Sequence, residues 1–150
     1  QQRYRLMWMV AKYELGTVKV VAYDKDGKAV AEKEIRTAGK PHHIELAPDR
    51  AQIKADGKDL SFVTVRVVDK DGNLCPLADN LISFKVKGAG TYRAGANGNP
   101  ASLESFQTPK MKVFNGMMTA IVSSTDKPGK ITLEATGKGL AKGVLEIESR

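Results

Sequence analysis

The stretch SFVTVRVVD, Ser61–Asp69, carries the clearest structural signal in this chain. Apolar and polar residues alternate along it, so that Ser61 and three alternate valines would face one way while Thr64 and Arg66 face the other. A period of two residues is that of a β-strand with one buried face. The stretch therefore predicts a strand at the centre of a β-sheet protein.

The same alternation recurs on either side of this strand. It is seen in ISFKVK (Ile82–Lys87), ITLEAT (Ile131–Thr136) and GVLEIE (Gly143–Glu148), and no segment shows a helical period over ten or more residues. Further strands are expected at Arg5–Ala11, Thr17–Tyr23, Ala29–Arg36, His42–Leu46, Ala51–Ala55 and Met117–Ser123. Many short strands separated by turns predict an all-β fold, an antiparallel β-sandwich.

The tetrapeptide DKDG occurs twice between strand-like runs, at Asp24–Gly27 and Asp69–Gly72. An Asp side chain opens a turn and Gly takes the positive φ that closes it, so each copy predicts a hairpin turn. A calcium loop is the alternative for Asp69–Asn73, but Leu74 and Asn80 stand where an EF-hand needs Gly and Glu. We expect no metal site here.

A domain boundary is expected within RTAGKPHH, around Gly39–Pro41, where Gly and Pro interrupt the strand pattern. About eight strands follow the boundary, enough for a complete sandwich, whereas only three precede it, too few for a core of their own. We expect Gln1–Gly39 to be the end of a preceding β-domain and Lys40–Arg150 to be one sandwich domain.

The composition excludes several classes of partner. The 150 residues carry a net charge of +7, yet basic and acidic residues alternate and aromatic residues make up only 6%. Nucleic-acid surfaces cluster their basic residues beside aromatic ones, and membrane spans need long apolar runs, so neither partner is expected. The single cysteine, Cys75, lies among apolar residues and is expected to be buried and inert.

Residues that could carry out catalysis are hard to find. The glycines at Gly88 and Gly90 lack the third glycine of a dinucleotide loop. His42 and His43 would point to opposite faces of a strand and so could not easily share a metal. Most of the 17 acidic residues would lie in turns or at outward strand positions. Glu104 and Glu134 are candidates only because they are not obviously in turns, and surface solubility explains them better than a catalytic pair does. We expect no catalytic residue, no metal and no cofactor.

Several longer phrases resemble a known family in their order and spacing. They include WMVAKYELGTVKVVAYDKDG (Trp8–Gly27), EIRTAGKP, IKADGKDLSFVTVRVVDKDGN (Ile53–Asn73) and GAGTYRAGANGNPASLESF (Gly88–Phe106). Together they resemble the C-terminal region of bacterial family 2 glycoside hydrolases of the β-galactosidase type. The resemblance implies immunoglobulin-like accessory domains that follow a sugar-binding jelly roll and a catalytic barrel, and a periplasmic or extracytoplasmic location. The family's catalytic glutamates belong to the barrel, so the resemblance places no catalytic residue here.

Two other classes share the fold. An immunoglobulin-like spacer of invasin-type adhesins would account for Ala55–Asn73 but has no place for Trp8–Gly39. A carbohydrate-binding module would need a row of exposed aromatic residues, and the aromatic residues of this chain are scattered. The resemblance implies other domains of a glycosidase as partners, and carbohydrate or a second copy of the chain as further possibilities.

One segment is singled out for binding. Between the strands expected at Ile82–Lys87 and Met117–Ser123, some thirty residues would cross one end of the sandwich as a loop. Long loops in compact domains are commonly functional, and glycines including Gly95 would supply positive φ for its turns. We expect Tyr92, Arg93 and Asn97 to contact another domain or a sugar, since Tyr and Arg are favoured at interfaces. The alternative is that Tyr92 covers the end of the core.

Overall fold

The computed structural model describes Met9, Lys12 and residues 14–150. The chain divides into two compact units, Gln1–Thr37 and Ala38–Arg150. The division lies two residues before the boundary expected at Gly39. The strand predicted at Arg5–Ala11 falls outside the described residues, apart from Met9. Each unit is described by itself.

The first unit contains a β-hairpin whose two strands have the predicted bounds. Strand β1 (Thr17–Tyr23) pairs antiparallel with β2 (Ala29–Arg36). The DKDG turn joins them: one oxygen of the Asp24 carboxylate accepts hydrogen bonds from the N–H groups of Asp26 and Lys28, each at 2.9 Å. Gly27 closes the turn with a φ of 79°. The hairpin predicted at the first DKDG is confirmed.

The two faces of this hairpin differ in chemistry. The face that carries Val18, Val20 and Ile35 is mainly apolar, although Lys33 lies opposite Val20, and Val18 and Ile35 leave 57% and 66% of their surface exposed. The opposite face carries an ion pair between Lys19 and Glu32 at 2.8 Å. Two strands alone rarely form a stable sheet in water. An apolar face on such a hairpin is suited to being covered by another part of a protein.

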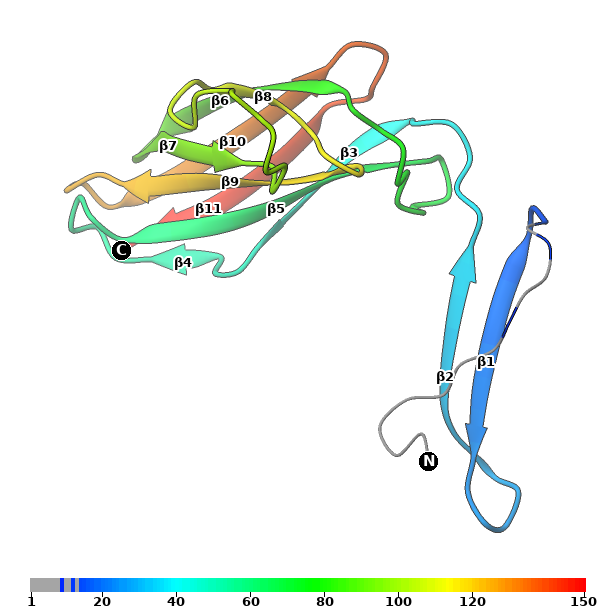
Figure 1. Ribbon diagram of the computed structural model, residues 1–150. Coiled ribbons are helices and arrows are strands. Elements are labelled where there is room, and N and C mark those ends of the chain that lie inside the picture. The colour runs from blue at the N-terminus through cyan, green and yellow to red at the C-terminus, as the bar shows by residue number, and fades with distance from the viewer. Residues whose placement is uncertain (1–8, 10–11, 13) are drawn as a thin grey trace. The chain divides into compact units, whose positions relative to one another are not determined.

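The second unit is a β-sandwich of two sheets (Figure 1). One sheet has the order β4-β11-β10-β6-β8 and the other the order β3-β5-β9-β7. Neighbouring strands are antiparallel except β4 and β11, which are parallel. The strands are β3 (His43–Pro48), β4 (Gln52–Ile53), β5 (Leu60–Val68), β6 (Leu81–Gly88), β7 (Gly90–Ala96), β8 (Lys110–Lys112), β9 (Met117–Ser124), β10 (Gly129–Gly137) and β11 (Gly143–Ser149). The predicted all-β sandwich is confirmed.

The core lies between the two sheets and is built from the alternating positions that the sequence indicates. Val63, Val65 and Val67 of β5 are fully buried, and they face Ile82 and Leu133 from the other sheet. Ser61 shares the inward face and satisfies its hydroxyl by donating to the Arg50 carbonyl oxygen at 2.9 Å. Burial of apolar surface is the main force that holds two such sheets together.

The second DKDG forms the same turn as the first, but at a buried position. Asp69 is only 3% exposed, and its carboxylate accepts from the N–H groups of Asp71 and Asn73 at 2.9 Å and from Gly39 at 2.7 Å. These hydrogen bonds hold the pKa of the Asp69 carboxyl well below its ordinary value, and the one from Gly39 has the largest effect. The turn thereby fastens the start of the second unit to its interior. Cys75 is buried nearby, as predicted, and burial raises the pKa of its thiol.

Two expectations from the sequence are wrong, one about the two histidine side chains and one about a loop. His42 precedes β3, so strand alternation does not separate it from His43, and the Nδ1 atoms of the two rings lie 3.1 Å apart. The segment between β6 and β9 is not one long loop, because it contains β7 and the short strand β8. Gly90 and Gly95 occupy two of the seven positions of β7 and obscure the strand pattern, since Gly is depleted in strands.

Candidate docking loop

Tyr92 is part of the sandwich rather than of a loop. It lies on β7, half-buried, with its ring stacked on that of Phe84 at a centroid distance of 5.5 Å and an interplanar angle of 18°. Its hydroxyl oxygen is buried without a hydrogen-bond partner among the described residues. Burial raises the pKa of Tyr92 to about 12. This placement matches the alternative in which Tyr92 covers the end of the core.

Arg93 occupies an irregularity in β7. The pairing with β9 joins Tyr92 to Val122 and Ala94 to Ile121, so that Arg93 is the extra residue of a β-bulge. Arg93 is exposed, and no ion pair to it occurs in the described part of the chain. A bulge redirects a side chain relative to the regular strand. Arg93 is thus free to reach a partner.

Asn97 organises the turn that follows β7. Its amide nitrogen donates to the carbonyl oxygen of Lys112 at 3.0 Å, and its amide oxygen accepts from the N–H of Asn99 at 3.0 Å. Gly98, next in sequence, has the positive φ expected of it, 73°. Because both ends of the Asn97 amide are engaged within the chain, its role is to hold the turn.

Glu104 fixes the middle of the same segment. One carboxylate oxygen accepts from the N–H of Lys112 at 3.2 Å, while the other lies 3.4 Å from the Asn97 amide nitrogen and 3.4 Å from the Ser102 hydroxyl. The segment is also tied to β7, because the carbonyl oxygen of Phe106 accepts from the N–H of Gly95 at 2.7 Å. We call residues 97–109 the docking loop, and these contacts give it a defined shape.

Two large apolar side chains project from this fastened loop. Leu103 is fully exposed, at 101%, and Phe106 is exposed to 61%. Neither was singled out from the sequence, although two large apolar residues in a segment rich in Gly, Asn, Pro and Ser were a visible signal. Leu103 and Phe106, like the exposed Arg93, are apolar and cationic side chains of the kinds found at the centre of protein interfaces.

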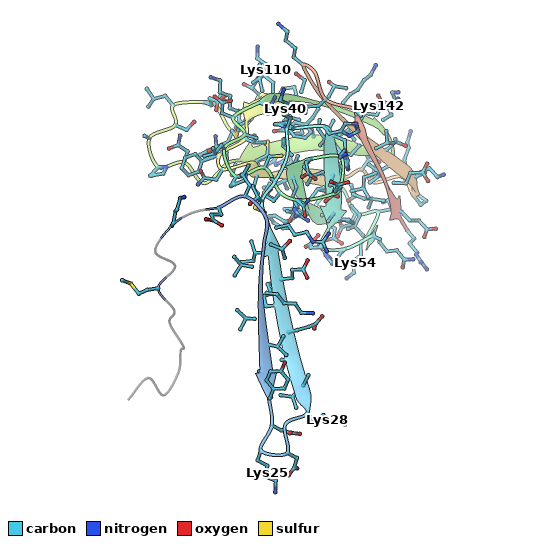
Figure 2. All side chains as sticks on the ribbon, turned by 90° about the vertical axis from the view of Figure 1, so that its right-hand side faces the viewer. Lys25, Lys28, Lys40, Lys54, Lys110 and Lys142 are labelled. Atoms are coloured by element: carbon cyan, nitrogen blue, oxygen red, sulfur yellow. The ribbon has the colours of Figure 1, made fainter. Side chains whose placement is uncertain are left out.

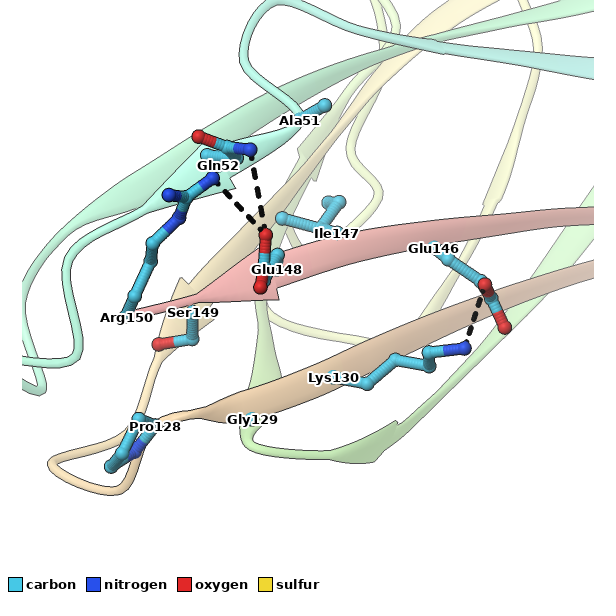
Figure 3. A pocket seen from close by; sticks show the side chains of 10 residues that line it. All are labelled: Ala51, Gln52, Pro128, Gly129, Lys130, Glu146, Ile147, Glu148, Ser149 and Arg150. Carbon is cyan, nitrogen blue, oxygen red and sulfur yellow. Dashed lines mark hydrogen bonds and ion pairs between the residues drawn. The ribbon is translucent and has the colours of Figure 1, made fainter.

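A shallow depression of about 620 Å³ lies elsewhere, over β4, β10 and β11 (Figure 3). Its polar side chains are engaged with one another. Glu148 lies 3.4 Å from the Gln52 amide nitrogen and 3.3 Å from an Arg150 guanidinium nitrogen, and Lys130 pairs with Glu146 at 2.9 Å. With these groups already paired and no aromatic residue among its walls, this depression is not a convincing sugar site.

Glu104 and Glu134, the two carboxylates considered as acids, are both engaged in the structure. Glu134 pairs with Lys87 at 2.6 Å, and this hydrogen bond lowers the pKa of the Glu134 carboxyl. Over the described residues, no three His, Cys, Asp or Glu side chains gather as they would around a metal ion. In the same part of the chain, no helix has the length and apolar character needed to cross a bilayer.

The fold and this arrangement define an accessory β-sandwich, and comparison with known proteins identifies its family. The family model for the glycoside hydrolase family 2 C-terminal domain 5 matches residues 44–146 of this chain. A second family model, for a domain of unknown function, matches residues 1–31. The chain belongs to glycoside hydrolase family 2, with its sandwich as the C-terminal domain 5 of that family.

Individual relatives agree with this assignment. The chain is 54% identical over 142 residues to the β-galactosidase BoGH2A of Bacteroides ovatus and 38% identical over 117 residues to a β-galactosidase of Thermoanaerobacter pseudethanolicus. These alignments cover 95% and 78% of this chain but only 16% and 14% of the relatives. A β-glycosidase structure from Bacteroides vulgatus superposes with a TM-score of 0.89 at 32% identity, covering 95% of this chain and 18% of that one. The chain thus spans about a sixth of the length of the curated relatives it matches.

The adhesin alternative rests on fold alone. A fragment of intimin superposes with a TM-score of 0.50 at 16% identity over 75% of this chain. Such a likeness shows a shared sandwich and nothing of function. The family assignment therefore favours the glycosidase over the adhesin spacer and over an autonomous carbohydrate-binding module.

Proposed function

We propose that this chain is the non-catalytic C-terminal part of a longer glycosidase of the β-galactosidase type, and that it supports the other domains of that enzyme. The parent activity is inferred from the relatives named β-galactosidase. The non-catalytic role is supported by the engaged state of Glu104 and Glu134, each of which is held by contacts within the sandwich. A periplasmic or extracytoplasmic location is part of this proposal.

The docking loop is the element we propose to make contact with another domain of the same polypeptide. Exposing Leu103 and Phe106 has no benefit for the isolated sandwich, because contact between apolar side chains and water raises the free energy. The hydrogen bonds of Asn97 and Glu104 hold these side chains outward in one arrangement. A preorganised loop loses little conformational entropy when it binds. Since the relatives are about six times longer than this chain, the parent has ample further polypeptide to supply the partner.

The observation that carries this proposal is the full exposure of Leu103 on a loop that is otherwise fastened. The test is the double variant L103S/F106S, made both in the 150-residue chain and in the complete enzyme. The chain alone should nearly keep its Tm, because Leu103 is fully exposed and most of the Phe106 side chain is exposed too. The complete enzyme should lose several degrees of Tm, since the loss of two buried apolar anchors costs about 2 kcal/mol or more.

The matched control is L77S. Leu77 is 95% exposed and lies outside the docking loop, so its replacement should leave both proteins unchanged. If L103S/F106S leaves the complete enzyme as stable as the native protein, the docking role is wrong. Incubation of the chain alone with a nitrophenyl β-galactoside tests the other half of the proposal. Turnover abolished by one Glu or Asp substitution would show that the sandwich is itself catalytic.

The apolar face of the β1–β2 hairpin fits the same scheme. Val18, Val20 and Ile35 form a surface that two strands cannot cover. We propose that this hairpin completes the sheet of a preceding accessory domain, with its ion-paired face toward water. The chain would then meet its parent enzyme at two places, the hairpin and the docking loop.

A further inference from the structure

The outer face of the β4-β11-β10-β6-β8 sheet separates its charges. Residues on this face alternate with the core residues of each strand, so they point to water. Strands β6 and β8 contribute only lysines as charged groups, whereas β10 and β11 carry the carboxylates together with Lys130. The lysines are Lys85, Lys87, Lys110 and Lys112, and the carboxylates are Glu134, Glu146 and Glu148.

The strand register places the lysines around two hydroxyl side chains. Lys110 of β8 lies opposite Ser83 of β6, which in turn lies opposite Thr136 of β10. Along β6, Lys85 follows Ser83 on the same face and lies opposite Glu134. Neighbouring strands are about 4.8 Å apart and same-face residues about 7 Å apart along a strand. Cationic and hydroxyl groups therefore form one continuous surface.

Most of these lysines lack a carboxylate partner. Glu134 pairs with Lys87 at 2.6 Å, which leaves Lys85, Lys110 and Lys112 without an ion pair among the described residues. Lys142 also has no ion pair among the described residues. It precedes Gly143 of β11, which pairs with Ala135, the residue next to Glu134 on β10. After the hydrogen bond from Lys87, the charges of Lys142 and Lys85 also lower the pKa of Glu134, so both lie near it. We call Lys85, Lys110, Lys112 and Lys142 the lysine face.

The chemistry of the lysine face selects one kind of partner. Lysine is depleted at the centre of protein–protein interfaces, and this face offers no aromatic or Arg anchor. The absence of aromatic residues from these strands' outer positions also disfavours single-stranded nucleic acid, which binds by base stacking. Flexible ammonium groups interspersed with hydroxyls suit a flat, hydrated polymer that carries anionic groups and many hydroxyls of its own.

We propose that the lysine face binds an anionic polysaccharide, one that carries sulfate or carboxylate groups on its sugars. The choice of a polysaccharide over other polyanions rests on the membership of a glycosidase family. The role is separate from the docking loop, and it would hold the parent enzyme near a charged glycan independently of the catalytic centre. Elsewhere on the same sheet Glu146 and Glu148 are paired with Lys130 and Arg150, so the positive charge of this sheet without an ion-pair partner in the described residues is concentrated on the lysine face.

The test compares two triple variants of the 150-residue chain that remove the same charge. One is K85Q/K110Q/K142Q, and the other is K25Q/K28Q/K54Q. Lys25 and Lys28 belong to the first unit and so are not part of this face. Within the sandwich, Lys110 and Lys142 lie on the same side in Figure 2 and Lys54 on another. Binding is measured by affinity electrophoresis and calorimetry at low and at physiological salt. The probes are dextran sulfate, polygalacturonate and neutral dextran. Both variants should keep the native Tm, because all six side chains are at the surface.

The native chain and K25Q/K28Q/K54Q should bind dextran sulfate or polygalacturonate and not neutral dextran. K85Q/K110Q/K142Q should bind these anionic polymers at least about tenfold more weakly than the native chain. Its affinity should also depend less on salt, because fewer counterions are released. A preference between the two probes distinguishes sulfate from carboxylate. Equal loss in both variants, or no binding of either probe at low salt, would overturn the proposal. So would a DNA duplex that binds the native chain as tightly as the better polysaccharide does.

Discussion

A methyl group placed on Gly95 would lie 2.5 Å from the hydroxyl oxygen of Tyr92. Gly95 does not have the positive φ expected of it from the sequence; it lies on β7, where its missing side chain leaves room for the Tyr92 ring and for Met118. The two residues are three positions apart on the bulged strand. Space, not backbone flexibility, is what this glycine provides.

Replacing Gly95 with Ala should therefore destabilise the sandwich by about 1–3 kcal/mol, as overpacking of a core does. Y92F alone should leave stability unchanged or slightly higher, because it removes a buried hydroxyl that has no hydrogen-bond partner. In the double variant the cost of G95A should shrink without vanishing, since Met118 Cε still lies 3.1 Å from the added methyl. Urea denaturation of the native chain, G95A, Y92F and the double variant measures the change in the free energy of unfolding for each variant. Additive effects would show that the two side chains do not compete for space.

Asn97 and Arg93, grouped together from the sequence, should behave differently when replaced by Ala. N97A removes three hydrogen bonds of the docking loop, one of them long at 3.4 Å, and should lower the stability of the isolated chain by about 1–2 kcal/mol. R93A removes an exposed side chain and should change it by less than about 0.5 kcal/mol. Thermal denaturation of both variants is the measurement, and a larger loss for R93A than for N97A would contradict this division of roles.

The pH dependence of stability should depend on Asp69. Its pKa is lowered in the folded chain, so its carboxylate contributes stability fully above its unfolded pKa of about 4, and the contribution is lost as the pH falls below that value. D69N should have a lower Tm at pH 7, and the gap from the native chain should narrow as the pH is lowered from about 4. Calorimetry between neutral and acidic pH records both effects.

D24N is the control for this variant, because Asp24 makes the same turn contacts at an exposed position. It should change the Tm of the sandwich much less than D69N. A gap between native and D69N proteins that stays constant down to the lowest accessible pH would show that the charge of Asp69 is not what stabilises the turn.

Truncation should locate the start of the sandwich. Removal of residues 1–37 should leave a cooperatively folding domain, whereas removal of residues 1–39 should lower its Tm by several degrees. The two additional residues matter because Ala38 packs against the core and the Gly39 N–H donates to the buried Asp69 carboxylate at 2.7 Å. Equal Tm values for the two truncations would place the boundary at Gly39, as expected from the sequence.

The alternation of side chains was sufficient to predict the sandwich. Strands such as β5 and β10 have one buried and one exposed face, so their apolar residues repeat every second position. Strand β7 was missed because Gly90 and Gly95 stand at inward positions, where neighbouring side chains fill the space. Strand β8, with three residues, is too short for any period to be visible.

The candidate site was less predictable than the fold. The sequence singled out the segment around Tyr92, Arg93 and Asn97, but residue type alone could not separate the half-buried Tyr92 from the exposed Phe106. Exposure of an aromatic side chain depends on which strand face it occupies, and the bulge at Arg93 alters that face locally. The approach of the two histidine rings likewise depends on where β3 begins, which sequence patterns place only within a few residues.

Strand β11 lies inside its sheet, between β10 and the short β4, and Gln52 of β4 reaches Glu148 across 96 positions of sequence. On a ribosome, the first eight strands of the sandwich would therefore emerge with the place of β11 still empty and the buried surface that Ile147 covers still open to water. The domain cannot close until its final strand has left the exit tunnel. Such distant pairings also slow folding, typically to milliseconds or seconds. During synthesis of the parent enzyme, this domain would thus be a late-folding unit that is open to chaperones.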